Sequence, residues 1–279
     1  MRVLLCACAG ALAVTGCKRP SAPSPQPRSE PSLASVHPKP APVPSTAPAP
    51  REQSRRFAAR ADGLCFSEGD GVAGAGDLLR IRDPKARAVL PDSDGDSARV
   101  SFRYHGPTQV TSALKSGARR RQLGLKLRAR DACNLIYVMW RLEPKQELVV
   151  SFKNNPDASS SSECGNDGYV TLRAAQRAAL PPLEAGSDHA LEAEVVGNDL
   201  DVRVDGNVVW HGALPTEALA LQGPSGFRSD NVEWSLHDFR IVRGAHPFSV
   251  RRCRAPLAHS APTSGTSSGA SSASGRPSE

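Results

Sequence analysis

The sequence predicts an all-β protein: a two-sheet antiparallel jelly-roll sandwich with a disordered N-terminal tether and a disordered C-terminal tail. The first observation is a hairpin at residues 133–155, where two alternating apolar strands flank a turn at 143–146. The second is that short alternating segments recur about every ten residues, separated by Gly, Asp, Asn and Pro, which is typical of sandwiches and jelly rolls. The third is that both ends of the chain are low-complexity and cannot bury a core.

The alternation assigns faces to the central hairpin. Ile136, Val138 and Trp140 fall on one face, which we expect to be buried, together with Leu148 and Val150 of the second strand. Tyr137 and Arg141 fall on the other, mixed face. Further strands are expected at 99–105, 123–128, 169–173, 189–196, 200–204, 207–211 and 232–242, the last with a slip in phase near 237–238. Short helices are expected at 172–180 and 216–221.

Trp140 and Trp234 stand in register with apolar neighbours, so we expect both in the core. Trp210 follows a hairpin and precedes His211 and Gly212. It is the tryptophan that we expect to be exposed.

Composition supports one folded domain between two unfolded ends. The chain has 279 residues, a net charge of +7 and 39% hydrophobic residues, a low value that the low-complexity ends explain. Residues 57–255 are long enough for one sizeable domain. The positive charge permits an anionic partner. No polybasic nucleic-acid motif is present, so nucleic acid is not expected as a partner, and the oligomeric state is left open.

The N-terminus indicates export. Residues 1–16 contain Arg2 followed by an apolar run of about a dozen residues, shorter than the roughly 20 that a membrane-spanning helix needs. The run ends in Val14-Thr-Gly-Cys17, which resembles the lipobox of bacterial lipoproteins. The resemblance implies that Cys17 is lipidated and becomes the new N-terminus. The alternative is an ordinary secretory signal that happens to end in cysteine.

A lipid on Cys17 would anchor the chain to a membrane. The residue that follows is Lys18, and in the sorting rule of enteric lipoproteins a residue other than aspartate implies the outer membrane. We therefore expect a cell-envelope location, on the periplasmic or the surface side. Residues 17–56 form the anchor and a proline-rich linker, of which residues 18–50 would extend over about 100 Å. Residues 256–279 form the Ser/Gly-rich tail.

Four cysteines remain in an exported domain, and disulfides are the default there. Three pairings exist. We favour Cys65 with Cys253, which would staple the two ends of the domain, and Cys133 with Cys164, which would pin the loop 154–166 to a strand edge. A zinc site is the alternative, although no Cys-x-x-Cys motif is present.

Residues 189–242 resemble the C-terminal half of concanavalin A-like domains, the laminin-G-like and glucanase-like superfamily. The resemblance rests on the hairpin at 198–209, with its Val-Asp-Gly turn, and on Gly223-Pro-Ser-Gly-Phe-Arg-Ser-Asp-Asn231 running into Trp234-Ser-Leu-His-Asp-Phe-Arg-Ile241. It covers about 55 residues and implies two antiparallel sheets and a sugar- or protein-binding history. The Glu-x-Asp-x-x-Glu strand of the glucanase-type members is absent, and the fold alone does not choose a function.

A meander of the strands at 99–105, 123–128, 135–142 and 148–153 would collect a basic face with one aromatic ring. Such a face suits an anionic glycan, because Arg can donate two parallel hydrogen bonds to a carboxylate and a Tyr ring can stack on a sugar ring. A solvated sheet face is the alternative reading. The predicted ligand-binding residues are Arg103, His105, Lys126, Arg128, Tyr137, Arg141 and Lys153.

One possible cofactor is calcium. Asp92, Asp94 and Asp96 have the spacing of a calcium loop, but position six is Ser97 and position twelve is Arg103, where an EF-hand has Gly and Glu. A polar turn is the alternative, and no other cofactor is expected.

The function that the sequence favours is non-catalytic glycan binding by an envelope-anchored lipoprotein. No catalytic residue is assigned. One alternative is a polysaccharide lyase or glycoside hydrolase of jelly-roll fold, for which His105, Arg103, Tyr137 and Arg141 supply the residue types of a lyase. The other alternative is a structural or protein-interaction module.

Overall fold

The computed structural model describes residues 63–73, 79–250 and 253–257. The expected signal, Cys17, the linker and most of the tail lie outside these residues. Among the described residues, no helix combines the length and the apolar character that crossing a bilayer requires.

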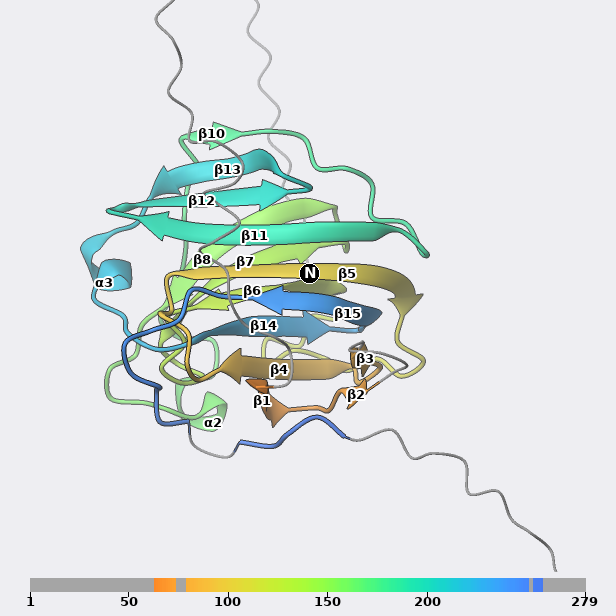
Figure 1. Cartoon of the computed structure of the whole chain (residues 1–279), viewed down its shortest axis with the longest axis horizontal. Helices are drawn as coiled ribbons and strands as arrows, with labels where there is room; N and C mark the ends of the chain where they lie inside the picture. Colours follow the sequence, from red (N-terminus) through yellow and green to blue (C-terminus); the bar gives the residue numbers. More distant parts are fainter. Residues whose placement is uncertain (1–62, 74–78, 251–252, 258–279) are drawn as a thin grey trace, which may run out of the picture. The chain divides into compact units, whose positions relative to one another are not determined.

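The described chain forms two antiparallel sheets (Figure 1). The seven-stranded sheet has the order β1-β4-β14-β6-β7-β8-β9. Its strands are β1 (Cys65–Glu68), β4 (Lys85–Leu90), β14 (Ser225–Asp230), β6 (Gln122–Leu127), β7 (Leu135–Arg141), β8 (Glu147–Lys153) and β9 (Tyr169–Thr171).

The eight-stranded sheet has the order β10-β13-β12-β11-β5-β15-β3-β2. Its strands are β10 (Gln176–Arg177), β13 (Asn207–Ala213), β12 (Asp199–Val204), β11 (Asp188–Val196), β5 (Ser97–Pro107), β15 (Val232–Arg240), β3 (Leu79–Ile81) and β2 (Val72–Ala73). Two single-turn helices, α2 (Ser161–Cys164) and α3 (Thr216–Leu219), lie in connections. The fold is the two-sheet antiparallel jelly-roll sandwich that the sequence predicts.

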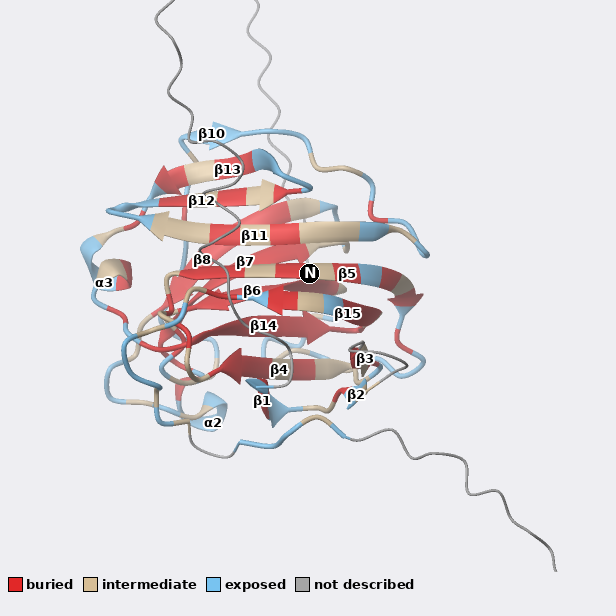
Figure 2. Cartoon of the chain, viewed as in Figure 1, coloured by how far each residue is buried: buried red, intermediate tan, exposed pale blue. Residues whose placement is uncertain are grey.

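The core lies between the sheets and follows the predicted alternation. Ile136, Val138 and Trp140 of β7 pack in one cluster with Leu148 and Val150 of β8 and with Trp234. Figure 2 shows buried residues running along β6 and β14, while β10 and most connections are exposed. The phase slip near 237–238 is confirmed, because the pairing of β15 with β5 shifts between Leu236 and Asp238.

Two expectations about local structure are wrong. Residues 172–180 contain the edge strand β10 and no helix, whereas the helix at 216–219 is present. Trp210 is only 1% exposed, because β13 lies inside the edge strand β10 and Arg177 pairs with Trp210 in register. A tryptophan on an inner strand is covered even when it follows a turn.

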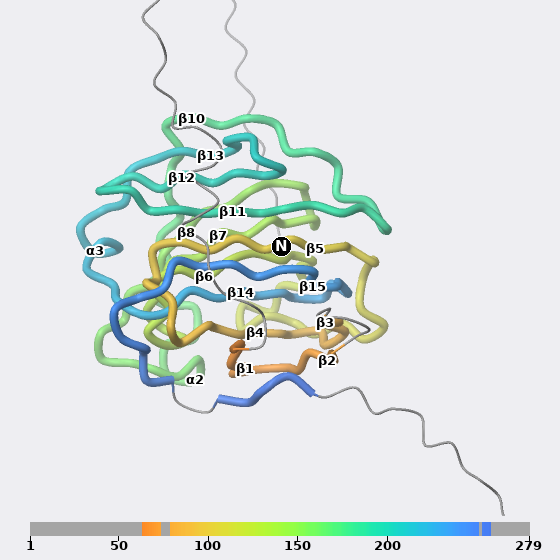
Figure 3. The backbone as a smooth tube through the Cα atoms, viewed as in Figure 1, coloured from red at the N-terminus to blue at the C-terminus, as the bar shows by residue number. Residues whose placement is uncertain are grey.

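Both favoured disulfides are present, Cys65–Cys253 and Cys133–Cys164. The first joins β1 to the C-terminal segment, which runs beside β1 (Figure 3). Backbone hydrogen bonds between Phe66 and Arg254 hold the same contact. Leu257 also pairs with the chain at Gly71 and Ala73, two residues into the predicted tail.

Candidate functional site

Three of the four predicted strands do form a meander in the seven-stranded sheet. Lys126 of β6 pairs with Tyr137 of β7, which pairs with Ser151 of β8. Because side chains alternate along a strand, all three project from the face that points away from the other sheet. Arg141 and Lys153 lie on this same outer face, near its opposite ends.

The fourth strand belongs to the other sheet, so two predicted site residues are elsewhere. Arg103 and His105 lie on β5, between β11 and β15. Arg103 pairs with Asp188, and His105 Nε2 lies 2.8 Å from Ser235 Oγ. The connection 108–121 carries the chain from one sheet to the other, so the assumed pairing of β5 with β6 is wrong. The lyase grouping is therefore divided between two sheets.

Arg128 also points away from this face. It follows β6 with a φ of 49°, a left-handed conformation that redirects the chain. Its guanidinium binds the Asp96 carboxylate before β5 and the Leu219 carbonyl oxygen of α3. Arg128 thus links the end of β6 to the start of β5 and to α3.

The three aspartates of the expected calcium loop each have a separate partner. Asp94 accepts backbone hydrogen bonds from Asp96 and Ser97, as in a polar turn. Asp96 binds Arg128, and Asp92 lies 3.5 Å from Arg243. In the described part of the chain, no three His, Cys, Asp or Glu side chains gather as a metal site. The contacts seen at these carboxylates are thus those of a polar turn and of two ion pairs.

The outer face contains functional candidates that the sequence reading missed. Arg228 and Asp230 come from β14, which inserts between β4 and β6. Asp230 accepts hydrogen bonds from Arg228 Nε (2.7 Å), Arg87 Nη2 (2.9 Å) and Gln122 Nε2 (2.7 Å). Their spacing of two residues in a strand was a usable signal, since it places Arg228 and Asp230 on one face.

Two tyrosines stack at the other side of this face. The rings of Tyr137 and Tyr169 have centroids 5.9 Å apart and are inclined by 22°. Arg228 Cζ lies 5.0 Å from the Tyr137 centroid, and Lys153 Nζ lies 4.9 Å from that of Tyr169. Lys153 also donates to the Gly165 carbonyl oxygen at 2.7 Å. Cations over ring faces are attracted by the ring quadrupole.

We call this group the outer-face cluster; its members are Arg87, Lys126, Tyr137, Lys153, Tyr169, Arg228 and Asp230.

Most of the cluster is buried, which the sequence did not predict. A second hydrophobic cluster on this face includes Leu135, Tyr137 and Met139, and Val250 of the C-terminal segment packs against it. The accessible side chains on this face include Tyr169, which is 41% exposed, the partly exposed Arg87 and, beside the cluster, the partly exposed Arg141. A ligand would therefore meet the edge of Tyr169 and two arginines with their carboxylate partners Glu68 and Glu147, above the buried cations.

The pKa shifts on this face reflect burial first and the neighbouring arginines second. Burial, reinforced by Arg87 and Arg228, lowers the pKa of Lys126 to about 7, and Glu68 only partly opposes this. Burial raises the pKa of Tyr137 to about 12. Burial would also raise the pKa of Asp230, but Arg228 and Arg87 outweigh it and the pKa is lowered. Asp230 is therefore ionised and serves as the counter-ion of both arginines.

Chemically, the face is equipped to attract an anion. Glu68 at its edge pairs with Arg87 at 2.9 Å, and Glu147 pairs with Arg141 at 3.2 Å. Asp230 is held by three donors. Retaining glycosidases place two carboxyl groups about 5 Å apart in acid and nucleophile roles. The carboxylates described on this face are each engaged by cations instead.

No protein-family model matches the chain, and no curated protein matches its sequence. Solved structures with similar strands include the carbohydrate-binding module CBM66 from Bacillus subtilis, at 13% identity and a TM-score of 0.45 over 63% of this chain and 93% of that one. The Caenorhabditis elegans galectin LEC-6 has 12% identity and a TM-score of 0.32, over 63% and 95%.

A laminarinase from Flavobacterium sp. UMI-01 has 10% identity and a TM-score of 0.36, over 67% of this chain and 95% of that one. At these identities and TM-scores, the likenesses carry no conclusion about ligand or activity.

Proposed function

We propose that this protein is an envelope-anchored lipoprotein that binds an anionic glycan, without cleaving it, on the outer face of the seven-stranded sheet. The observation that carries the proposal is Lys126, a buried lysine whose close neighbours Arg87 and Arg228 are also cations. A carboxylate or sulfate of a ligand above it would neutralise charge that the protein leaves uncompensated.

The exposed tyrosine edge supplies the second half of the recognition. Tyr169 offers apolar ring surface and a hydroxyl, which suit the alternating apolar and polar patches of a sugar ring. Arg141 and Arg87, both partly exposed, offer guanidinium groups that fork around an acidic substituent. The ligand class that meets both requirements is an acidic polysaccharide.

Anchoring is proposed from the sequence, because Cys17 lies outside the described residues. Its test is fractionation of cells that express the full chain, with Cys17→Ser as the variant. We expect the wild type in the membrane fraction and the variant released from it. Equal fractionation of the two proteins would favour an ordinary secretory signal.

Glycan binding is tested with the full chain on immobilised acidic and neutral polysaccharides, at low and at high salt. We expect retention on acidic polysaccharides that weakens as salt rises, because exposed charge pairs are screened. The supernatant is checked for reducing ends and for unsaturated uronates. Release of either product would overturn the non-catalytic part of the proposal.

Two variants locate the binding face. Arg141→Gln, on the outer face of the seven-stranded sheet, is expected to weaken retention. Arg103→Gln is the matched control, because Arg103 is an arginine on the outer face of the eight-stranded sheet. Loss of binding in the Arg103→Gln variant alone would place the ligand on the other sheet. If no polysaccharide is retained, the glycan-binding proposal is wrong and a protein-interaction module is the function that remains.

A further inference from the structure

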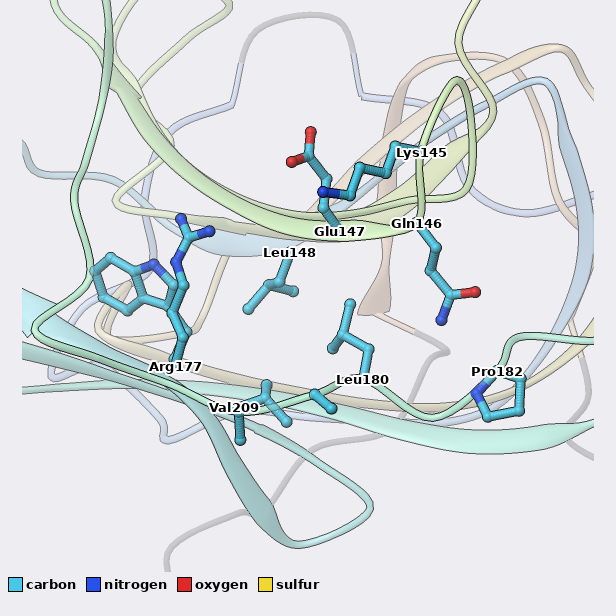
Figure 4. Close-up of a pocket in the computed structure, with 11 residues that line it drawn as sticks. Lys145, Gln146, Glu147, Leu148, Arg177, Leu180, Pro182 and Val209 are labelled. Atoms are coloured by element: carbon cyan, nitrogen blue, oxygen red, sulfur yellow. The ribbon is translucent and has the colours of Figure 1, made fainter.

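A pocket of about 470 Å³ opens between the two sheets, away from the outer-face cluster (Figure 4). Its lining comes from the β7–β8 turn, the start of β8, the edge strand β10 with the segment after it, and β13. In Figure 4, Leu148 points from β8 toward Leu180 and Val209 on the opposite side. The volume is within the range of small-molecule sites, about 300–1,000 Å³.

One wall of this pocket is apolar and continuous with the core. Leu148, Val209 and Trp210 are members of the main hydrophobic cluster, and Leu180 packs against it. A ligand that enters here would bury hydrocarbon against these side chains, and burial of apolar surface is favourable. The pocket therefore suits a ligand with an apolar body.

The mouth of the pocket is cationic. Arg177 and Lys145 belong to its lining, and the side chain of neither makes an ion pair or hydrogen bond with any residue that the structure describes. The lining carboxylate, Glu147, is already paired with Arg141 at 3.2 Å. Gln146 donates to the Pro181 carbonyl oxygen at 2.5 Å and so closes one end. The free charge at this mouth is positive.

A buried donor in the lining also lacks an acceptor. Trp210 is 1% exposed, and its indole Nε1 has no hydrogen-bond partner among the described residues. Trp140 and Trp234 share that property deep in the core, but Trp210 is the one of the three that lines this pocket. Unpaired buried donors are rare and call for an explanation, and an oxygen of a bound ligand is one.

We propose that this pocket is a binding site for a small amphipathic monoanion, a carboxylate on an apolar body of medium length. The apolar body lies against Leu148, Leu180 and Val209, and the carboxylate meets Arg177 at the mouth. An arginine suits this role because its planar fork matches a carboxylate. The site is separate from the glycan-binding face and does not rest on that function.

The test is calorimetric titration of the full chain with octanoate. Octan-1-ol and octylamine serve as the uncharged and cationic analogues. We expect octanoate to bind and Arg177→Gln to weaken it by about tenfold, since a charge-assisted hydrogen bond is lost. The matched control is Arg173→Gln, an exposed arginine of the same segment outside the pocket lining, which is expected to bind as the wild type does.

Trp210 gives a second readout that reports on the pocket itself. Octanoate is expected to change the tryptophan fluorescence of the wild type, and Trp210→Phe is expected to remove that change while a thermal melt shows that the variant is folded. Three results would overturn the proposal: no binding of octanoate, equal affinity in the Arg177→Gln variant, or octan-1-ol binding as tightly as octanoate. None of them bears on polysaccharide retention, so the two proposals fail separately.

Discussion

Arg228 and Asp230 form a buried ion pair two residues apart on β14, with Arg228 Nε donating to Asp230 Oδ2 across 2.7 Å. Asp230 has no exposed surface. The same carboxylate binds Arg87, so one anion holds two cations beneath the outer face of the sheet. The position of Arg228 over the Tyr137 ring follows from this pairing. Asp230 is therefore a positioning residue for the proposed binding face.

Asp230→Asn is expected to lower the free energy of unfolding by about 3–5 kcal/mol, because it leaves the buried guanidinium group of Arg228 without its counter-charge and Arg87 with Glu68 alone. Urea unfolding of the full chain measures this. The control is Asp188→Asn, which removes the exposed partner of Arg103 and should change stability little. Equal effects of the two variants would contradict a buried role for Asp230.

Lys126 should make the stability of the fold depend on pH. Its folded pKa of about 7 lies below the usual value of a lysine in an unfolded chain. Between these values the unfolded state binds more protons, so stability should rise as pH increases above about 7, by at most about 1.4 kcal/mol per pH unit. Below about 7 the full penalty for burying the charge remains.

The measurement is urea unfolding of the wild type and of Lys126→Met at several pH values between neutral and mildly alkaline. The methionine keeps the unbranched shape and most of the length of the side chain without its charge. We expect the variant to be the more stable protein at neutral pH, with the difference shrinking as pH rises. A constant difference across that range would show that Lys126 does not titrate near 7.

The sequence predicted what depends on local alternation. Trp140 and Val138 point into the core because side chains alternate along a strand, whatever that strand pairs with. The β7–β8 hairpin and its neighbour β6 were also predictable, since consecutive strands with short connections usually pair. Both disulfides are the pairing that was favoured among three, from where the cysteines lie relative to the domain ends and to the 154–166 loop.

The predictions that were wrong or missing depend on pairing between strands that lie far apart in the sequence. The alternation of β5 is as clear as that of β6, but it does not say that 108–121 crosses to the other sheet, so Arg103 and His105 were placed wrongly. Likewise, β14 enters between β4 and β6 from about a hundred residues away, which brings Arg228 to Tyr137. No local pattern contains that contact.

The Cys133–Cys164 disulfide should stabilise the fold and order Lys153. The disulfide joins residues 31 positions apart in the sequence. Replacing both cysteines by alanine removes this constraint on the unfolded chain and should lower the free energy of unfolding by about 3–4 kcal/mol. Lys153 Nζ lies 2.8 Å from Cys164 Sγ. Without this sulfur, Lys153 would lose one of the contacts that hold it beside Tyr169. Urea unfolding under non-reducing conditions gives the loss of stability.

The comparison variant replaces Cys65 and Cys253, whose separation is 188 residues. Because the entropy of the unfolded chain grows with the closed loop, its loss should be at least as large. A loss below about 1 kcal/mol for the Cys133/Cys164 variant would mean that the 154–168 segment is held by its hydrogen bonds alone.

The last prediction joins charge to the proposed ligand. Lys126 is faced by Arg87 of β4, Arg228 of β14, Tyr137 of β7 and, more weakly, Glu68 of β1. An anionic group bound above it would favour its charged form and raise its pKa. Binding above pH 7 should therefore take up a proton, and the affinity for an acidic polysaccharide should fall as pH rises, by at most about tenfold per unit.

Calorimetric titrations in two buffers with different heats of ionisation measure the proton uptake directly. Uptake should be near zero well below pH 7, where Lys126 is already protonated, and should increase above it. Lys126→Met is expected to abolish the uptake, whereas Lys115→Met, on the exposed connection 108–121, should keep the wild-type profile. Proton uptake that persists in the Lys126→Met variant would assign the proton to another group. It would then contradict the prediction that the anionic group of the ligand binds above Lys126.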